Sequence, residues 1–305
     1  MNLHLLRIFA AVAEHRSFSR AASALFISQP AVSKAVRQLE HQLDLPLMER
    51  SAGSARGARG VRLTESGQAL FEHARGIFAL ERAATEEVRA RVGLKRGRLG
   101  IGASTTIAGY WLPPYAAQFA RQVPGAQLQI RVGNTQMVGA ALIGCEIDLA
   151  LVEGQVNDAR IAATLWRDDE LQIIAPPDAA LARRRKPTLE ELNAQAWLLR
   201  EPGSGTREIT DRVMRAQRIE PDRTIEFGSN EGIARAVAAG IGVAMLPARV
   251  VRELLRMGEV IALKVSHSVA SPLVRPLYLL QLRERPNSPL ARKFCALLTQ
   301  VLERR

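Results

Sequence analysis

A short stretch near the N-terminus gathers side chains that could recognise an external polar surface. Apolar residues recur at Val32, Val36 and Leu39, which is the period of a helix with one buried face. The opposite face then presents Pro30, Ser33, Lys34, Arg37 and His41, with Gln29 at the start of the helix. Amide, hydroxyl and cationic donors near the start of a helix suit base edges and phosphates in a DNA groove. An ordinary amphipathic helix with a solvated basic face is the alternative.

The preceding residues indicate the elements that would position this face. Residues 3–15 carry apolar side chains at helical spacing, and Ser19 is expected to cap a second, alanine-rich helix that runs to about Leu25. Ser28 then caps a third helix, with Pro30 in its first turn, where a missing N–H costs nothing. This order predicts a helix-turn-helix whose last helix lies on DNA.

Four short motifs occur together in this part of the chain. They are Phe18-Ser19-Arg20-Ala21-Ala22, Ser28-Gln29-Pro30-Ala31-Val32-Ser33, Leu39-Glu40 and Val61-Arg62-Leu63-Thr64-Glu65-Ser66-Gly67. With them, residues 1–66 resemble the winged helix-turn-helix of LysR-type transcriptional regulators, which usually have alanine where this chain has Ser66. The resemblance implies a homo-oligomer, dimer or tetramer, that binds an interrupted inverted repeat in double-stranded DNA. RNA polymerase is a further candidate partner.

The segment between Arg50 and Val61 is longer than is typical of that family. It reads Ser-Ala-Gly-Ser-Ala-Arg-Gly-Ala-Arg-Gly, a flexible composition. Such a basic wing could enter the minor groove or follow phosphates, and a merely solvated loop is the alternative. The expected DNA-contacting residues are therefore Arg20, Gln29, Pro30, Ser33, Lys34, Arg37, Arg56, Arg59 and Arg62.

The charge balance agrees with a polyanionic partner. The net charge is +12 and the sequence pI is about 10.8. Residues 1–98 hold 16 basic and 9 acidic side chains, so +7 of this charge lies there. Cys145 and Cys295 lack the spacing of metal ligands, so free, buried thiols and no metal site are expected. Because no signal peptide or apolar span is apparent, we expect a cytoplasmic protein without membrane contact.

Residues from Thr64 to about Val92 read as one long helix, with Gly93 just past its end. Leu70, Ala74 and Ile77 lie near one apolar stripe, while charged residues fill much of the rest. A stripe of this kind has to be buried against something, so an interaction helix is indicated. The family resemblance implies a linker and dimerisation helix over residues 64–93.

From Leu99 onward, strands and helices alternate, which predicts α/β units with parallel strands. One unit begins at Leu99 and a second near Glu170. This part resembles the effector domain of the same family, which shares its fold with periplasmic solute-binding proteins. The expected fold class is α/β, with a winged helix-turn-helix (1–66), a long linker helix (64–93) and a two-lobed effector domain (94–305). Lobe I would comprise about 94–163 and 268–305, and lobe II about 164–267.

The expected strands end in turns rich in small polar residues. In open α/β lobes, ligands bind beyond the carboxyl ends of strands, near helix N-termini. Hydroxyls, amides and helix dipoles suit a small anion such as a carboxylate, a sulfur oxyanion or a phosphate. Taken singly, each residue is as well explained as an ordinary helix cap. The expected effector-binding residues are Ser104, Thr105, Thr106, Asn134, Thr135, Glu153, Ser204, Thr206 and Asn230.

Two motifs indicate a branch within the family. Gly102-Ala103-Ser104-Thr105-Thr106 and Arg200-Glu201-Pro202-Gly203-Ser204-Gly205-Thr206-Arg207 look most like the regulators of carbon fixation and sulfur assimilation. The effector, the operator and the direction of control are left open by the sequence.

Three rival functions compete with this interpretation. An enzyme would need a placed base, nucleophile or metal, but only His267 lies outside the DNA-binding and linker segments, so no catalytic residue is expected. A transport protein would require export, and an architectural DNA-binding protein would not need two lobes with a polar cleft. No cofactor is expected besides the small-molecule effector.

Overall fold

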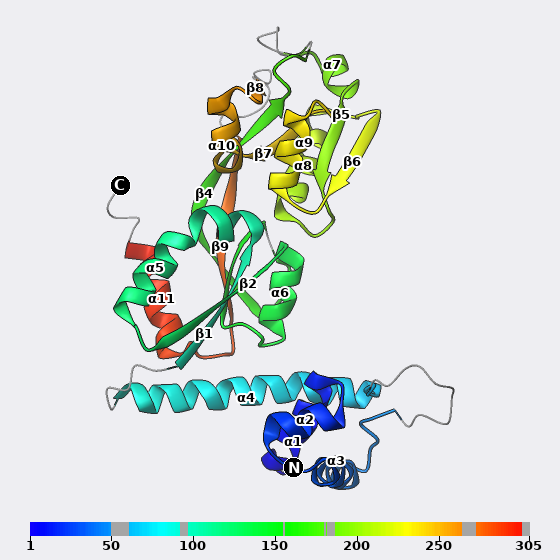
Figure 1. The fold of residues 1–305 in the computed structure, drawn as a ribbon, viewed down its shortest axis with the longest axis vertical. Helices are drawn as coiled ribbons and strands as arrows, with labels where there is room; N and C mark the ends of the chain where they lie inside the picture. Colours follow the sequence, from blue (N-terminus) through cyan, green and yellow to red (C-terminus); the bar gives the residue numbers. More distant parts are fainter. Residues whose placement is uncertain are drawn as a thin grey trace. The chain divides into compact units, whose positions relative to one another are not determined.

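The computed structural model describes residues 1–49, 61–91, 97–154, 156–179, 181, 187–263 and 273–300 (Figure 1). The candidate residues Arg56 and Arg59, together with His267, lie outside these ranges. The chain divides into two compact units, Met1–Arg82 and Ala83–Arg305, and each has its own hydrophobic core.

Three helices build the core of the first unit: α1 (Leu3–His15), α2 (Phe18–Leu25) and α3 (Gln29–Leu43). They share a buried apolar cluster that includes Leu6, Phe9 and Leu39. The small side chains of Ala21 and Ala22 are buried in the same cluster, so the backbone of α2 can approach its neighbours closely. The predicted helix-turn-helix is therefore present with nearly the expected bounds.

Serine side chains begin two of these helices. Ser28 accepts a hydrogen bond from a backbone N–H in the first turn of α3, as predicted, and Pro30 lies in that turn. The expectation that Ser19 caps α2 is wrong, because the cap is Ser17, whose side chain accepts from the backbone N–H of Arg20. Both serines fit the composition of a cap, but only Ser17 stands three residues before a free N–H.

A long helix, α4 (Glu65–Arg91), follows the wing. Thr64 caps it by accepting a hydrogen bond from the backbone N–H of Gly67 at 3.0 Å. A Cβ added to Gly67 would lie 2.0 Å from the carbonyl oxygen of Leu47, so only glycine fits this close approach. Ala74 of α4 is buried in the core of the first unit, whereas residues 83–91 belong to the second unit.

Seven strands of the described residues form one sheet that runs through the second unit. Its order is β2 (Ala126–Gly133), β1 (Gly97–Ser104), β3 (Leu149–Glu153), β9 (Leu273–Leu282), β4 (Ile161–Ala175) and β7 (Ala244–Pro247), and β8 (Ile261–Leu263) also pairs with β4. β1 pairs in parallel with β2 and β3, whereas β9 pairs antiparallel with both β3 and β4. The long antiparallel pair β4–β9 connects the two lobes of this unit.

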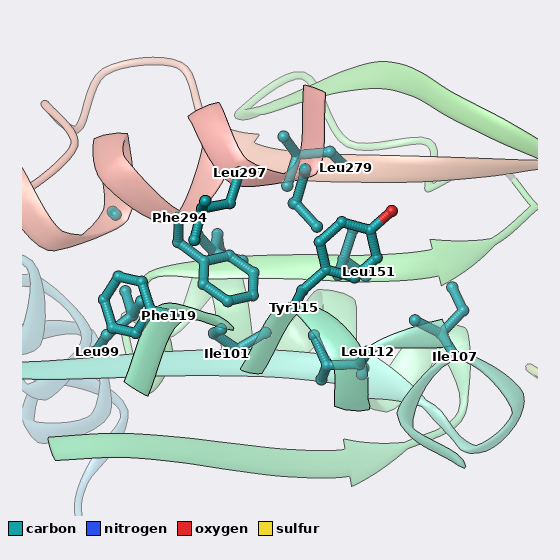
Figure 2. Close-up of a cluster of buried hydrophobic side chains, with 14 of the residues drawn as sticks. Leu99, Ile101, Ile107, Leu112, Tyr115, Phe119, Leu151, Leu279, Phe294 and Leu297 are labelled. Atoms are coloured by element: carbon teal, nitrogen blue, oxygen red, sulfur yellow. The ribbon is translucent and has the colours of Figure 1, made fainter. Parts of the chain in front are cut away.

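Lobe I contains the β2-β1-β3 side of the sheet with helices on both faces. One face carries the short π-helical turn η1 (Ile107–Trp111), α5 (Pro113–Gln122) and α11 (Pro289–Gln300), and the other carries α6 (Thr135–Ile143) (Figure 1). Figure 2 shows the core under α5 and α11, where the rings of Phe119 and Phe294 lie edge to face with centroids 5.4 Å apart. Two distant segments of the chain therefore complete one core.

Lobe II is built around a parallel pair of strands, β5 (Ala196–Arg200) and β6 (Arg223–Phe227). Its helices are α7 (Leu189–Asn193), α8 (Gly205–Gln217), α9 (Asn230–Ala238) and α10 (Ala248–Met257). Trp197 of β5 forms a bridge with Val243, next to β7. This bridge sets the strand pair beside the end of the large sheet.

Several details differ from the sequence-based expectations. β4 begins at Ile161 rather than near Glu170, and α10 and β8 were not anticipated. The helical segment after β1 is divided into η1 and α5, and Pro113 stands at the start of α5. Both cysteines are half-buried rather than buried. Of the helices that the structure describes, none has both the length and the apolar character needed to cross a bilayer.

Candidate functional site

The outer face of α3 carries most of the candidate DNA-contacting side chains. Exposed side chains on α2 and α3 are Arg20, Gln29, Pro30, Lys34 and Arg37, and Ser33 is half-buried. Gln29 Nε2 donates to Ser33 Oγ at 3.0 Å, and Arg37 Nε donates to the Ser33 carbonyl oxygen at 3.3 Å. Each of these contacts joins residues four positions apart, so α3 itself arranges the donors on its exposed face.

Of the candidate wing arginines, Arg62 lies within the described residues. Met48 and Leu63 form an antiparallel bridge at the base of the wing. Arg62 Nε lies 3.8 Å from Glu49 Oε2, and both side chains are at least half exposed. An exposed ion pair of this length contributes little to stability, so Arg62 can exchange Glu49 for a phosphate at small cost.

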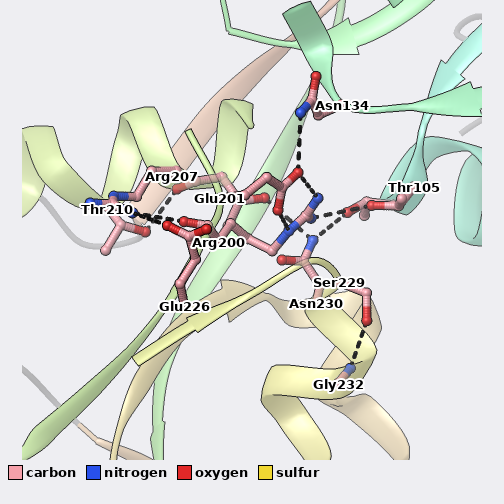
Figure 3. Close-up of polar contacts among 12 residues, drawn as sticks. Thr105, Asn134, Arg200, Glu201, Arg207, Thr210, Glu226, Ser229, Asn230 and Gly232 are labelled. Carbon is pink, nitrogen blue, oxygen red and sulfur yellow. Dashed lines mark hydrogen bonds and ion pairs between the residues drawn. The ribbon is translucent and has the colours of Figure 1, made fainter. Parts of the chain in front are cut away.

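Polar side chains of the two lobes meet where the strands end (Figure 3). Thr105 follows β1 and Asn134 follows β2 in lobe I, while Arg200 ends β5 in lobe II and Glu201 follows it. Asn134 Nδ2 donates to Glu201 Oε1 at 3.3 Å, and Arg200 Nη1 donates to Thr105 Oγ1 at 3.3 Å. These two contacts join the lobes side chain to side chain.

Asn230, at the start of α9, makes a third contact between the lobes. Its side chain is fully buried, and Nδ2 donates to Thr106 Oγ1 at 2.8 Å and to Thr206 Oγ1 at 3.3 Å. Its Oδ1 is also buried and has no hydrogen-bond partner among the described residues. Such an unpaired buried acceptor is costly unless another molecule supplies a donor.

Arg200 and Glu201 form a two-pronged ion pair. Arg200 Nε donates to Glu201 Oε2 and Nη2 donates to Oε1, both at 2.8 Å. The Arg200 side chain is 3% exposed and that of Glu201 is 24% exposed. Burial alone would raise the pKa of Glu201, but hydrogen bonds and attraction from Arg200 lower it below the ordinary value. Neither residue was among the sequence candidates, although both follow the same strand-end rule.

A buried charged cluster lies where the connecting strands pass between the lobes. Arg275 of β9 approaches Asp169 of β4 at 2.8 Å and Glu153 of β3 at 3.2 Å, and it donates to Thr206 Oγ1 at 2.8 Å. Burial raises the pKa of Asp169, and the positive charge of Arg275 opposes that shift. Glu153 was expected to bind an effector, but here it is paired within the protein. Asp169 and Arg275 were missed, because nothing local marks them as partners.

The remaining candidates divide between caps and buried contacts. Thr135 Oγ1 donates to the Glu153 carbonyl oxygen at 2.7 Å. Ser104 Oγ accepts from the Ile107 N–H at 3.3 Å, and Asn134 Oδ1 caps α6 at 2.9 Å, so the cap interpretation holds for both. Ser204 is buried at the start of α8 and makes no capping hydrogen bond with its side chain.

A groove of about 450 Å³ separates the beginnings of α6 and α8. It is lined by Thr135, Gln136, Val156, Asn157, Pro202, Gly203, Ser204, Arg207, Glu208 and Asp211. Both helices direct backbone N–H groups and their positive dipole ends towards this region, which favours an anion. The part of the chain that the structure describes contains no group of three or more histidine, cysteine, aspartate or glutamate side chains able to hold a metal ion.

Family models match both units of the chain. Residues 3–68 match the bacterial regulatory helix-turn-helix protein of the lysR family, and residues 93–303 match the LysR substrate binding domain. The fold and the polar interlobe site thus define a ligand-responsive DNA-binding protein. The chain belongs to the LysR family of transcriptional regulators, which are not enzymes, and the predicted resemblance is confirmed.

Curated relatives agree over nearly the whole chain. The HTH-type transcriptional regulator CysL of Bacillus subtilis is 33% identical over 267 residues, which cover 88% of this chain and 87% of the relative. A RuBisCO operon transcriptional regulator of Allochromatium vinosum is 33% identical over 298 residues, covering 96% and 94%. The branch indicated by the two effector-domain motifs is supported by these relatives.

Solved structures show the same architecture. A full-length OxyR from Pseudomonas aeruginosa, solved as a point variant, has a TM-score of 0.74 and 25% identity, and the match covers 99% of this chain and 94% of that one. The regulatory domain of CcmR from Synechocystis PCC6803, solved in complex with 2-PG, has a TM-score of 0.61 and 26% identity, covering 68% and 97%.

Proposed function

We propose that this regulator binds a small anionic metabolite between lobes I and II and controls transcription without consuming it. The observation that carries the proposal is the meeting of strand-end side chains across the lobes, at the Asn134–Glu201 and Thr105–Arg200 contacts. The two helix N-termini at the nearby groove add positive potential. The binding of 2-PG by the similar regulatory domain of CcmR supports the same class of ligand.

The ligand would act by changing how the lobes close. Hydrogen bonds between the lobes are made by side chains that a ligand can also engage, so ligand binding and closure draw on the same donors. A ligand shifts such an equilibrium only by its difference in affinity for the two states. Coupling of this kind is typically about 1–3 kcal/mol, which is enough to alter DNA bending or polymerase contact while DNA binding persists.

At the other end of the chain, we infer that α3 reads an interrupted inverted repeat through Gln29, Pro30, Ser33, Lys34 and Arg37. Exposed donors on a helix whose other face is buried support this assignment. Arg20 and the wing residues Arg56, Arg59 and Arg62 would add contacts to phosphates. The protein would act in the cytoplasm as a dimer or tetramer held by the helix over residues 64–93, and RNA polymerase would be its further partner. The effector domain would comprise residues 94–305.

The test combines calorimetry with DNA binding on the full chain. We expect Thr105→Ala and Ser204→Ala to weaken effector binding by about 1 kcal/mol each, the net contribution of an ordinary hydrogen bond. DNA affinity without effector should survive in both variants. Thr224→Ala, an exposed residue of β6 in lobe II, is the matched control. If no carboxylate, sulfur oxyanion or phosphate binds the wild type, the proposal fails.

A further inference from the structure

We propose that the carboxylate of Glu201 is an internal ligand, which occupies Arg200 until the anionic group of the effector displaces it. This inference rests on the proposed function, because it assumes that an anion enters the interlobe site. It goes further by naming Arg200 as the group that binds the anion (the receptor) and Glu201 as the carboxylate of the same chain that competes for it (the competitor).

The geometry of the pair is that of a bound carboxylate. Arg200 Nε and Nη2 donate to the two Glu201 oxygens at 2.8 Å each, and Asn134 Nδ2 adds a third hydrogen bond from lobe I at 3.3 Å. A planar guanidinium presents this fork equally to carboxylates and to phosphates. An external anion in the same place would therefore receive the same three donors.

The two partners differ in their freedom to move. Arg200 ends β5, which pairs in register with β6, and its side chain is 3% exposed. Glu201 follows the end of the strand, and its side chain is 24% exposed. Glu201 can therefore turn out to solvent and be hydrated, whereas Arg200 stays in the interior. A buried guanidinium without an anion is strongly unfavourable, so Arg200 requires one partner or the other.

The same arrangement indicates which ligands are suitable. An anion with two or more oxygens restores every bond that Glu201 gives up, while the Thr105 hydroxyl remains hydrogen-bonded to Arg200 Nη1. A neutral or cationic ligand cannot compensate for the loss of the Arg200–Glu201 ion pair. A donor elsewhere on the ligand would also satisfy the unpaired Oδ1 of Asn230 in the same interlobe cluster. The ligand class that fits is a small carboxylate, phosphate or sulfur oxyanion that also carries a hydroxyl or another donor.

Competition by Glu201 also lowers the apparent affinity of the site. Hydrogen bonds from Arg200 hold the pKa of Glu201 below its ordinary value, so the competitor is ionised at neutral pH. When only a fraction of the molecules has the receptor open, the apparent Kd rises in inverse proportion to that fraction. Weakening the competitor must therefore strengthen anion binding.

Calorimetry with the full-length chain tests this, using inorganic phosphate, sulfite and 2-PG as probes. Glu201→Gln keeps the shape of the competitor and removes its charge, so the Kd should fall about tenfold if the receptor is open in about one molecule in ten. Glu253→Gln is the matched control, because Glu253 is also paired with an arginine, Arg256, at 3.1 Å on α10. It should bind like the wild type.

A double variant, Arg200→Gln with Glu201→Gln, removes the receptor without leaving an unpaired buried charge. It should lose about a hundredfold in affinity, while its circular dichroism and Tm report that it is folded. If Glu201→Gln binds as the wild type does or more weakly, or if the double variant keeps its affinity, the internal-ligand proposal is overturned and the proposed function stands. If neither the wild type nor Glu201→Gln binds any probe, both proposals fail.

Discussion

On the outer face of α3, Gln29 bonds to Ser33 four positions away, whereas between the lobes Asn230 bonds to Thr106 across 124 positions of sequence. The first pair is on the surface, and the second is buried. The α3 face is therefore arranged by one helix and keeps exposed donors for an outside partner. The interlobe residues bond largely to one another, so a ligand there has to replace existing contacts.

The largest effect on the free energy of unfolding is expected from substitution of Arg275, which lies in the buried interlobe cluster. Arg275→Met would leave Asp169 and Glu153 buried without the guanidinium that joins them, which should cost about 3–5 kcal/mol of unfolding free energy. Urea unfolding followed by circular dichroism measures it. Arg256→Met removes an exposed pair on α10 and should cost less than about 1 kcal/mol. Equal losses in the two variants would show that the buried cluster is not a special feature of the lobes.

The second effect concerns binding rather than stability. Ser33→Ala combined with Arg37→Ala should weaken binding to a selected operator by roughly 1–3 kcal/mol per base-contacting residue. Because both residues lie on the outward face of α3, the unfolding free energy should change by less than about 0.5 kcal/mol. Fluorescence anisotropy on operator and random duplexes separates sequence reading from phosphate binding. Arg121→Ala, an exposed arginine of α5, is the control. Unchanged operator affinity would remove α3 from the assignment.

A smaller effect on stability is expected at the cap of α2, where the contact is local in sequence. Ser17→Ala removes the side chain that accepts from the Arg20 N–H at 3.3 Å, and should cost about 1 kcal/mol of stability. Ser19→Ala is the matched control, because Ser19 lies within α2 and its hydroxyl does not cap the helix. Thermal unfolding of both variants compares them. A larger loss at Ser19 would restore the sequence-based cap.

The smallest effect is a pH dependence at Glu201. The pKa of Glu201 is lower in the folded chain than its ordinary value of 4.5. Its stabilising contribution is therefore fully present above about pH 4.5 and is lost as the pH falls through the folded pKa. The Tm difference between the wild type and Glu201→Gln should stay constant above about pH 4.5 and should shrink as the pH falls below that value. A difference in Tm that does not shrink on further acidification would contradict the assignment.

The sequence predicted best what short-range patterns determine. The bounds of α1, the cap at Ser28 and the buried stripe of α3 all follow from spacings within one helix. The error at Ser19 arose at the same scale, since two nearby serines satisfied the composition of a cap and only the free N–H of Arg20 distinguishes them.

Partners between the lobes could not be predicted in the same way. The strand-end rule selected Thr106, Thr206 and Asn230, which the fold brings into contact. It could not pair Arg275 with Asp169, which lies 106 positions away, because that contact depends on the register of β4 against β9. The acidic run Asp168-Asp169-Glu170 also concealed the first part of β4, since charged residues in succession are unusual inside a strand.

The composition of lobe I from two distant segments affects how the protein is made. Residues 1–82 are contiguous, so the helix-turn-helix can fold as soon as it leaves the ribosome. Lobe I has to wait for β9 and α11, which contribute Leu279 and Phe294 to its core and are translated after all of lobe II. During synthesis, the helix-turn-helix is therefore complete well before the unit that would bind the effector. A truncated chain that ends before β9 would contain the DNA-binding helices without a complete effector-binding unit.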